Sequence, residues 1–157
     1  MERNSYEIVL NTFEAIPQDI KDLMDYGTIR PNRQGRNELG VTGSFTVFQN
    51  IGAETQIHWS VYKVDIMGHK RMFLDGTGSL CQIIAKDESI YPQLLETSNL
   101  PPQDSCPFPK GNYTIFNYIL DEQRFPPVAI RSDWLFEVII TRDGKVCGGF
   151  RVGLTTK

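Results

Sequence analysis

The fold is decided by residues 81–118, a stretch that combines one helical pattern with two cysteines. Its first part reads Cys81-Gln-Ile-Ile-Ala-Lys-Asp-Glu-Ser-Ile-Tyr-Pro-Gln-Leu-Leu-Glu96, and a later part reads Asp104-Ser-Cys-Pro-Phe-Pro-Lys-Gly-Asn-Tyr113. In the first part, apolar residues recur at the spacing that places them on one stripe of a helix. The pattern predicts one helix over residues 83–95, with a stripe formed by Ile83, Ile84, Ile90, Tyr91, Leu94 and Leu95.

Most of the remaining chain alternates apolar and polar residues, which is typical of strands with one buried face. The alternation is clearest at Leu39–Val47, Ile57–Val61 and Trp134–Ile140. Arg142-Asp-Gly-Lys145 is a strong hairpin signal near the end of the chain. We therefore predict a mainly β fold, an antiparallel two-sheet β-sandwich or β-cup of roughly seven to eight strands with one inserted helix.

Two segments before residue 40 are harder to interpret. Residues 31–37 have the composition of a turn, because proline, asparagine and glycine dominate them. Residues 19–26 fit a helical turn, but residues 26–30 can equally continue as a strand. Neither segment divides the chain, and we expect residues 1–157 to form one domain.

Composition excludes several classes of protein. A hydrophobic fraction of 40% with 22% charged residues is ordinary for a soluble globular chain, and a net charge of −3 gives no support for a nucleic-acid partner. No apolar run approaches the roughly 18 residues of a membrane-spanning helix. Met1–Tyr6 lacks the features of a secretory signal, so either the protein stays inside the cell or a signal was removed before this numbering begins.

The three cysteines leave the redox state open. Cys81 precedes the predicted helix and Cys106 lies in the loop that returns from it, so we predict a disulfide between them. Cys147 lies in a predicted strand, where a small buried apolar residue is expected. The alternative is that all three are reduced core thiols.

The sequence contains no recognisable catalytic or metal-binding motif. His58 and His69 are not at ligand spacing from each other or from a cysteine pair, and no nucleophile elbow is present. Gly76-Thr-Gly-Ser79 does not complete a phosphate-binding fingerprint. We predict a protein without catalytic activity, metal or cofactor. Asn112-Tyr-Thr114 is a candidate N-glycosylation site.

Aromatic and aliphatic residues on the predicted inward faces carry the functional hypothesis. They either fill a solid core or line a cavity for a hydrophobic ligand, and periodicity cannot separate the two because both need the same pattern. The cavity hypothesis names Phe45, Val47, Ile57, Trp59, Val61, Phe73, Ile83, Ile84, Ile90, Leu94, Leu95, Phe116, Trp134, Phe136 and Val138. At its rim, His69, Arg71 and Lys110 are candidates for contact with a polar head group.

The run from Asp104 to Tyr113, taken with Gly76-x-Gly-x-x-Cys81 and Ser98-Asn-Leu100, resembles the insect secreted family that includes the CheB chemosensory proteins. That family is similar to the ganglioside activator protein and to ML-type lipid-recognition domains. The resemblance implies a β-cup that holds a lipid outside the cell without catalysis, in a family linked to taste or pheromone perception. It supports Cys81 and Cys106 as a bridged pair, whereas the odd Cys147 departs from it.

We therefore expect a secreted, extracellular, non-enzymatic binding protein for a lipid or other hydrophobic small molecule. The alternative is an extracellular protein-interaction module with a filled core that acts through a receptor protein. An enzyme is the least supported hypothesis. The sequence does not identify the ligand.

Overall fold

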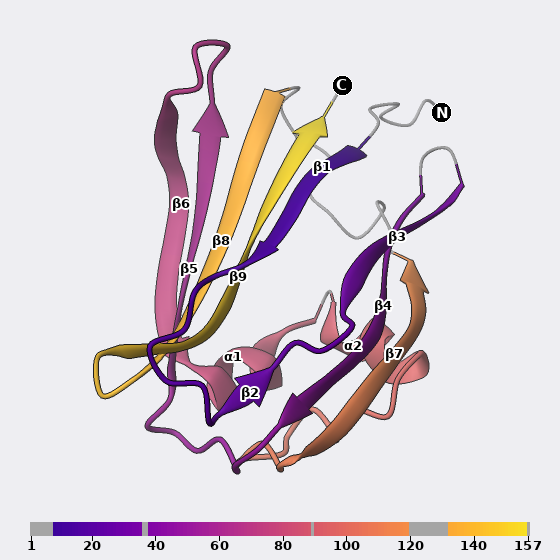
Figure 1. The fold of residues 1–157 in the computed structure, drawn as a ribbon, viewed down its shortest axis with the longest axis vertical. Coiled ribbons are helices and arrows are strands. Elements are labelled where there is room, and N and C mark those ends of the chain that lie inside the picture. The colour runs from indigo at the N-terminus through magenta and orange to yellow at the C-terminus, as the bar shows by residue number, and fades with distance from the viewer. Residues whose placement is uncertain (1–7, 36–37, 89, 120–131, 157) are drawn as a thin grey trace.

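A computed structural model describes residues 8–35, 38–88, 90–119 and 132–156. These residues form two antiparallel sheets and two short helices (Figure 1), which confirms the predicted mainly β sandwich or cup. The elements are β1 Ile8–Ala15, β2 Met24–Asp25, β3 Arg30–Gly35, β4 Glu38–Val47, β5 Gln56–Val64, β6 Lys70–Ser79, α1 Leu80–Lys86, α2 Tyr91–Glu96, β7 Gly111–Ile119, β8 Ser132–Arg142 and β9 Lys145–Thr156.

Five strands form the larger sheet, here called sheet A, in the order β1-β9-β8-β5-β6. The smaller sheet B is built around β4, which pairs with β7 along one edge and with β2 and β3 in succession along the other. Figure 1 shows the two sheets diverging from a common base, where α1 and α2 lie. The base is where apolar residues of both sheets meet.

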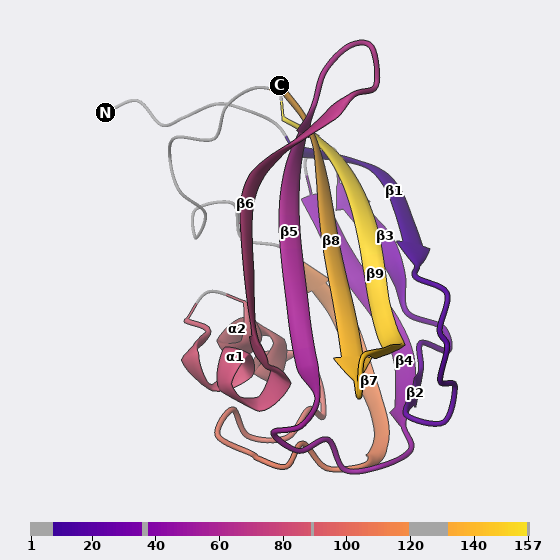
Figure 2. The same cartoon turned by 90° about the vertical axis from the view of Figure 1, so that its left-hand side faces the viewer.

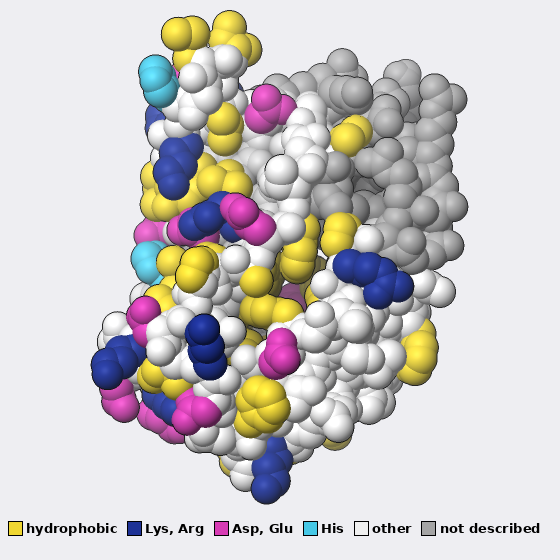
Figure 3. All heavy atoms as spheres, in the orientation of Figure 1, with side chains coloured by type: hydrophobic (Ala, Val, Ile, Leu, Met, Phe, Trp, Pro, Cys, Tyr) yellow, Lys and Arg dark blue, Asp and Glu magenta, His cyan; other side chains and the backbone are white. Residues whose placement is uncertain are grey.

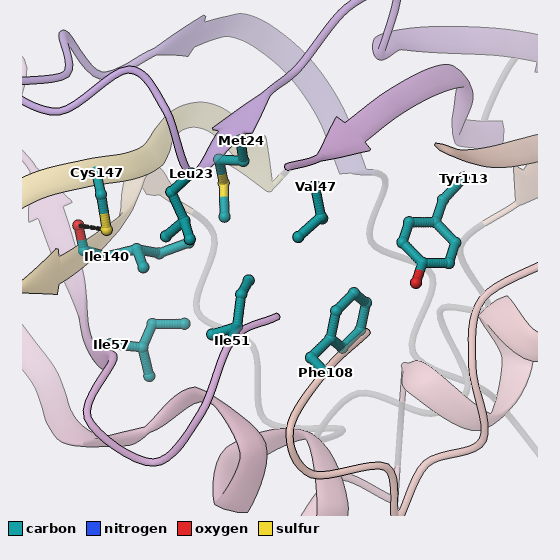
Figure 4. Close-up of a cluster of buried hydrophobic side chains, with 9 residues drawn as sticks. All are labelled: Leu23, Met24, Val47, Ile51, Ile57, Phe108, Tyr113, Ile140 and Cys147. Carbon is teal, nitrogen blue, oxygen red and sulfur yellow. Dashed lines mark hydrogen bonds between the residues drawn. The ribbon is translucent and has the colours of Figure 1, made fainter. Parts of the chain in front are cut away.

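The core at this base draws residues from both sheets and from the loops between them (Figure 4). Burying each aliphatic side chain stabilises the fold by about 1.5–3 kcal/mol, so this cluster is what joins the two sheets. It consists of Leu23, Met24, Val47, Ile51, Ile57, Phe108, Tyr113, Ile140 and Cys147.

The predicted helix over residues 83–95 is wrong in its continuity, because α1 ends at Lys86 and α2 begins only at Tyr91. Asp87 lies between them, and its carboxylate accepts hydrogen bonds from the backbone N–H groups of Ile90 and Tyr91. Pro92 lacks an N–H and would clash with the carbonyl four residues earlier in a continuous helix. Both features end one helix and begin another.

The predicted turn over residues 31–37 is also wrong in part, since residues 30–35 form β3. Arg30, Pro31 and Asn32 pair with successive residues of β4, and the register then shifts before Gly35. Proline is tolerated here because β3 lies at an edge of sheet B. Pairing with β4 satisfies the backbone, which outweighs the turn-like composition.

The hairpin predicted at Arg142–Lys145 is confirmed as the turn between β8 and β9. Asp143 and Gly144 both have positive φ, at 53° and 75°. Two-residue turns with this backbone match the right-handed twist of the flanking strands, and Asp-Gly is the pair that adopts them readily.

One irregularity in β7 overturns a predicted orientation. The pairing of β4 with β7 shifts register between Val41 and Gly43, and Asn117 has a φ of 52°. Because of this extra residue, Ile115 and Tyr118 are both buried while Phe116 is 63% exposed. The prediction that Phe116 faces inward is therefore wrong.

Candidate functional site

The disulfide between Cys81 and Cys106 forms as predicted. Cys81 lies in the first turn of α1, which begins where the Ser79 hydroxyl accepts a hydrogen bond from the Gln82 N–H. The bond fastens the loop after α2 to the start of α1. A disulfide is consistent with an oxidising compartment. Cys147 is free and fully buried, as expected of a small core residue.

The connection after α2 is tied back to both helices by further contacts. The Tyr91 hydroxyl donates to the Pro101 carbonyl at 2.8 Å. The Gln103 side-chain amide donates to the Ile84 carbonyl at 2.9 Å and also to the Asp87 carbonyl. Together with the disulfide, these bonds hold α1, α2 and their connection as one wall beside sheet A.

An open groove of about 750 Å³ lies between this wall and the edge of sheet A. Figure 2 shows α1 and α2 beside the lower end of β6, where the groove lies. Its volume is within the range of about 300–1,000 Å³ typical of small-molecule sites. It is lined by Trp59, Thr77, Gly78, Gln82, Ile83, Ile84, Lys86, Asp87 and Ile90.

Two glycines of β6 make room for the apolar side of this groove. Gly76 pairs with Trp59, and a Cβ added at Gly76 would lie 2.5 Å from Cζ2 of the indole. A Cβ at Gly78 would lie 3.4 Å from Cδ1 of Ile83. The indole of Trp59 therefore lies against the backbone of Gly76, and Ile83 packs over Gly78.

Beyond the packed base, the inner face of sheet A continues as apolar surface that is only partly covered. Val61 pairs with Leu74 on one side and with Phe136 on the other, so all three side chains share this face. Leu74 is 54% exposed and Phe136 is 38% exposed. Phe73 is also half exposed, and its ring contacts that of the buried Trp134, with centroids 5.1 Å apart.

The structure separates the predicted cavity residues into groups. Val47 and Ile57 belong to the packed core, against which Phe45 and Val138 also pack. Trp59, Ile83, Ile84 and Ile90 line the groove. The inner face of sheet A presents Val61, Phe73, Trp134 and Phe136. Leu94 and Leu95 are partly buried in α2, and Phe116 is 63% exposed in β7.

Sequence reasoning missed several residues of this site. Leu74 belongs to the inner face, although a register shift next to it in β6 hides its orientation from simple alternation. Gln82, Lys86 and Asp87 give the groove a polar rim. In the sequence, Gly76 and Gly78 form only an incomplete phosphate-binding pattern. Two glycines at alternate positions of one strand are nevertheless a signal of close approach by neighbouring side chains.

A second, more polar recess of about 680 Å³ lies at the far end of sheet A, beside the β5–β6 turn. His69 and Arg71 line it, so these two of the three residues predicted at the rim lie at this recess and not at the groove beside α1. Lys110 does not join them. Lys110 lies just before β7, and its backbone N–H donates to the Asn50 side chain. The next residue, Gly111, pairs with Val47 at the base of the molecule.

Burial raises the pKa of several groups close to the core, among them Tyr91 and Cys147. It raises the pKa of Tyr91 to about 12, with a smaller contribution from the nearby Tyr113. Burial also raises the pKa of the Cys147 thiol, which keeps it protonated and unreactive. Neither group is positioned as a reactive nucleophile at the groove.

The histidines lie on exposed surfaces and pair with carboxylates. His58 Nε2 is 3.6 Å from Asp75 on the outer face of sheet A, and His69 Nδ1 is 3.7 Å from Asp65 in the β5–β6 turn. Among the described residues, no group of three or more His, Cys, Asp or Glu side chains could hold a metal ion. Within the same ranges, neither helix is long and apolar enough to cross a membrane.

Asn112 of the glycosylation motif is exposed at the start of β7. Its side-chain oxygen accepts a hydrogen bond from the Thr46 hydroxyl, and the Thr114 hydroxyl bonds to that of Ser44. The motif thus lies along the pairing of β7 with β4, with the asparagine open to solvent.

A comparison of the sequence with family models finds a match. The model for "Protein of unknown function (DUF1091)" matches residues 57–136, just over half of the chain. The chain belongs to the DUF1091 family. The DUF1091 match runs from β5 through β6, α1, α2 and β7 into β8, and so includes the disulfide and the groove. No curated protein matches the chain.

Proposed function

We propose that this DUF1091 protein is a secreted, non-enzymatic binding protein for a lipid or other hydrophobic small molecule. One observation carries the proposal: apolar surface on the inner face of sheet A extends past the packed base and adjoins a groove beside α1. Trp59 is the residue common to both, since it shares the inner face with Val61 and also lines the groove. Figure 3 shows hydrophobic side chains gathered in a hollow between the two sheets.

The chemistry of the groove supports a ligand with an apolar body and a polar end. Ile83, Ile84 and Ile90 offer aliphatic surface, and removing such surface from water yields roughly 25 cal/mol per Å². Lys86 and Asp87 lie at the same groove and can contact a head group. Few polar groups around a mainly apolar lining is the usual composition of a small-molecule site.

Two features support an extracellular location. The Cys81–Cys106 disulfide is favoured in oxidising compartments. Asn112 is exposed within its Asn-Tyr-Thr motif, so a glycan could be attached there without displacing the core. The resemblance of the Asp104–Tyr113 run to the insect CheB proteins supports a role in chemosensory perception, of pheromones or tastants.

The test uses the position of the two tryptophans. Trp59 lines the groove, whereas Trp134 is buried and donates to the Thr156 hydroxyl. A spin-labelled fatty acid should quench the fluorescence of the native protein and of a Trp134→Phe variant. In a Trp59→Phe variant we expect weaker quenching, because the remaining Trp134 is buried and does not line the groove. An unlabelled fatty acid should reverse it by competition.

Groove variants make the test specific. Ile84→Gln with Ile90→Gln should weaken binding of the labelled fatty acid by about tenfold or more, because apolar contacts are replaced by amides that need water. Phe116→Gln is the matched control, since Phe116 is exposed outside the groove. No saturable quenching in the native protein, or equal binding by the groove and control variants, would refute the proposal.

A protein-interaction module that acts through a receptor is the second candidate. The tightly packed base favours it, as do three consecutive exposed residues in the edge strand β6, namely Met72, Phe73 and Leu74 at 47–54% exposure. Exposed apolar edges of this kind are typical contact surfaces. Native mass spectrometry after lipid extraction separates the candidates, because a module with a filled core retains and takes up no lipid.

A further inference from the structure

The turn between β5 and β6 carries two apolar side chains at its apex. Ile66 is 100% exposed and Met67 is 75% exposed. Figures 1 and 2 show this hairpin projecting past the ends of the neighbouring strands of sheet A. Apolar side chains so fully exposed contribute little to the stability of the fold, and these two are adjacent at one apex, where both are free to contact an apolar surface outside the protein.

The shape of the turn depends on other residues. The Asp65 carboxylate accepts hydrogen bonds from the N–H groups of Met67 and His69, both at 2.9 Å. The Gly68 N–H donates to the Asp65 carbonyl, and Gly68 adopts a φ of 85°. The side chains of Ile66 and Met67 take no part in these bonds. Polar residues at both positions would serve the turn equally well.

Basic residues surround the base of this apex. Lys63, Lys70 and Arg71 line the polar recess beside the turn, together with His69. Lys70 Nζ lies 4.5 Å from the centre of the Tyr62 ring, which holds the ammonium group close to the sheet. Figure 3 shows hydrophobic side chains at the tip with His and Lys or Arg side chains beside them.

Two carboxylates share the recess and must be counted. Asp65 is engaged by the turn and lies 3.7 Å from His69, and Asp133 accepts a hydrogen bond from the Thr155 hydroxyl. Three Lys or Arg residues against two Asp residues leave a net charge of +1 with His69 neutral, whereas the whole chain carries −3. The residues that line this recess thus carry a small positive net charge in a protein that is acidic as a whole.

We propose that the β5–β6 tip, Lys63 to Arg71, is a contact site for an anionic membrane surface. Ile66 and Met67 would enter the boundary between head groups and acyl chains, while Lys63, Lys70 and Arg71 meet anionic head groups. An apolar apex with a basic collar is the arrangement that such surfaces bind. Two apolar side chains are too small for a stable protein interface, which buries about 1,200–2,000 Å² in total.

A membrane contact would let the proposed lipid carrier reach a bilayer. Only this biological role rests on the proposed function. The geometry of the tip is independent of the groove, because the recess at the tip and the groove beside α1 have no lining residue in common. The two proposals can therefore fail separately.

Vesicle flotation tests the contact with the intact protein. Native protein should bind phosphatidylcholine vesicles that contain phosphatidylserine more strongly than vesicles of phosphatidylcholine alone, and added salt should reduce the difference. Ile66→Ser with Met67→Ser should lower partitioning into the anionic vesicles by about tenfold or more. Lys63→Gln, Lys70→Gln and Arg71→Gln should each lower it by about fivefold.

Matched controls lie elsewhere on the surface. Phe116→Ser removes an apolar side chain that is 63% exposed from β7, and Lys145→Gln removes a cation from the β8–β9 turn at the opposite end of sheet A. Both should bind vesicles as the native protein does. The Ile66→Ser and Met67→Ser variant should unfold at the native urea concentration, since the hydrogen bonds of the turn do not use the replaced side chains.

Three outcomes would overturn the inference. The first is vesicle binding that the Ile66 and Met67 substitutions leave unchanged, and the second is equal binding to neutral and anionic vesicles. The third is self-association that the same substitutions abolish, because the tip would then contact a second copy of the chain. Uptake of the spin-labelled fatty acid from solution should be native in the tip variants. If the native protein takes up no fatty acid, the carrier proposal is refuted, but the proposed membrane contact is not.

Discussion

Gly76 lies directly opposite Trp59 in the β5–β6 pair, and the indole occupies the space that any side chain at position 76 would need. The same indole lines the groove beside α1. A residue with no side chain therefore fixes where the largest aromatic side chain of the site lies. Substitutions at Gly76 should report on both stability and ligand binding.

Gly76→Ala should destabilise the protein by about 1–3 kcal/mol, because the new Cβ would lie 2.5 Å from Cζ2 of Trp59 and force the ring to move. Urea unfolding gives the free energy, and the emission of Trp59 should shift as its ring moves. Gly78→Ala is the control, since its Cβ would meet Ile83 at an ordinary 3.4 Å. Equal effects of the two substitutions would contradict this account.

Replacing both Cys81 and Cys106 with serine should lower the free energy of unfolding by about 3.5 kcal/mol, the chain-entropy estimate for a separation of 25 residues. The disulfide also joins the start of α1 to the loop that closes the groove wall, so the groove should become susceptible to proteolysis between the two positions. Urea unfolding of oxidised and reduced native protein provides the comparison. Reduction that leaves the midpoint unchanged would show that the bond is not structural.

Cys147 should be the one thiol detected after denaturation, and it should not react in the native state. Its side chain is fully buried, so a reagent cannot reach it. Burial also raises the pKa of its thiol, so the reactive thiolate does not form. A thiol reagent applied with and without denaturant measures both. Detection of three thiols under denaturing, non-reducing conditions would contradict the Cys81–Cys106 bond.

Alkaline pH should destabilise the fold through Tyr26 and Tyr91. Burial is the largest cause that raises the pKa of each to about 12 from an ordinary value of 10.0, so the native state keeps protons that the unfolded chain has lost. Stability is unaffected below pH 10 and falls between pH 10 and about 12. Each tyrosine should contribute on the order of 2 kcal/mol to this loss.

Ultraviolet titration of the phenolates checks the assignment. Tyr26→Phe and Tyr91→Phe should each remove one group from the late part of the titration. Tyr62→Phe serves as the comparison, because its ring lies on the outer face of sheet A beneath Lys70. If all the tyrosines ionise together near pH 10, the burial of Tyr26 and Tyr91 does not control stability.

Much of the fold follows from local patterns in the chain. Alternation located β5 and β8, and the Asp143-Gly144 pair located the turn into β9, because these signals depend only on backbone geometry and on which side chains prefer water. The Cys81–Cys106 disulfide could also be predicted from the sequence, since one cysteine precedes the helical stretch and the other follows it. These are short-range properties.

The candidate site was predictable only in part. Trp59, Ile83, Ile84 and Ile90 were named for a cavity and do line one groove. Phe116 was placed on the wrong face, because one extra residue in β7 reverses the alternation after it. The break at Asp87 was missed because the apolar stripe continues through it, although Pro92 was a signal for it.

The sequence by itself determined that this chain forms antiparallel strands with one helical insertion, and which residues prefer to leave water. Only the tertiary structure decided which of those residues pack against each other at the base and which remain partly open on the inner face of sheet A. The physical reason is that burial in a two-sheet protein depends on how far the sheets diverge and on the register of each strand pair. Both are set by contacts between residues far apart in the chain.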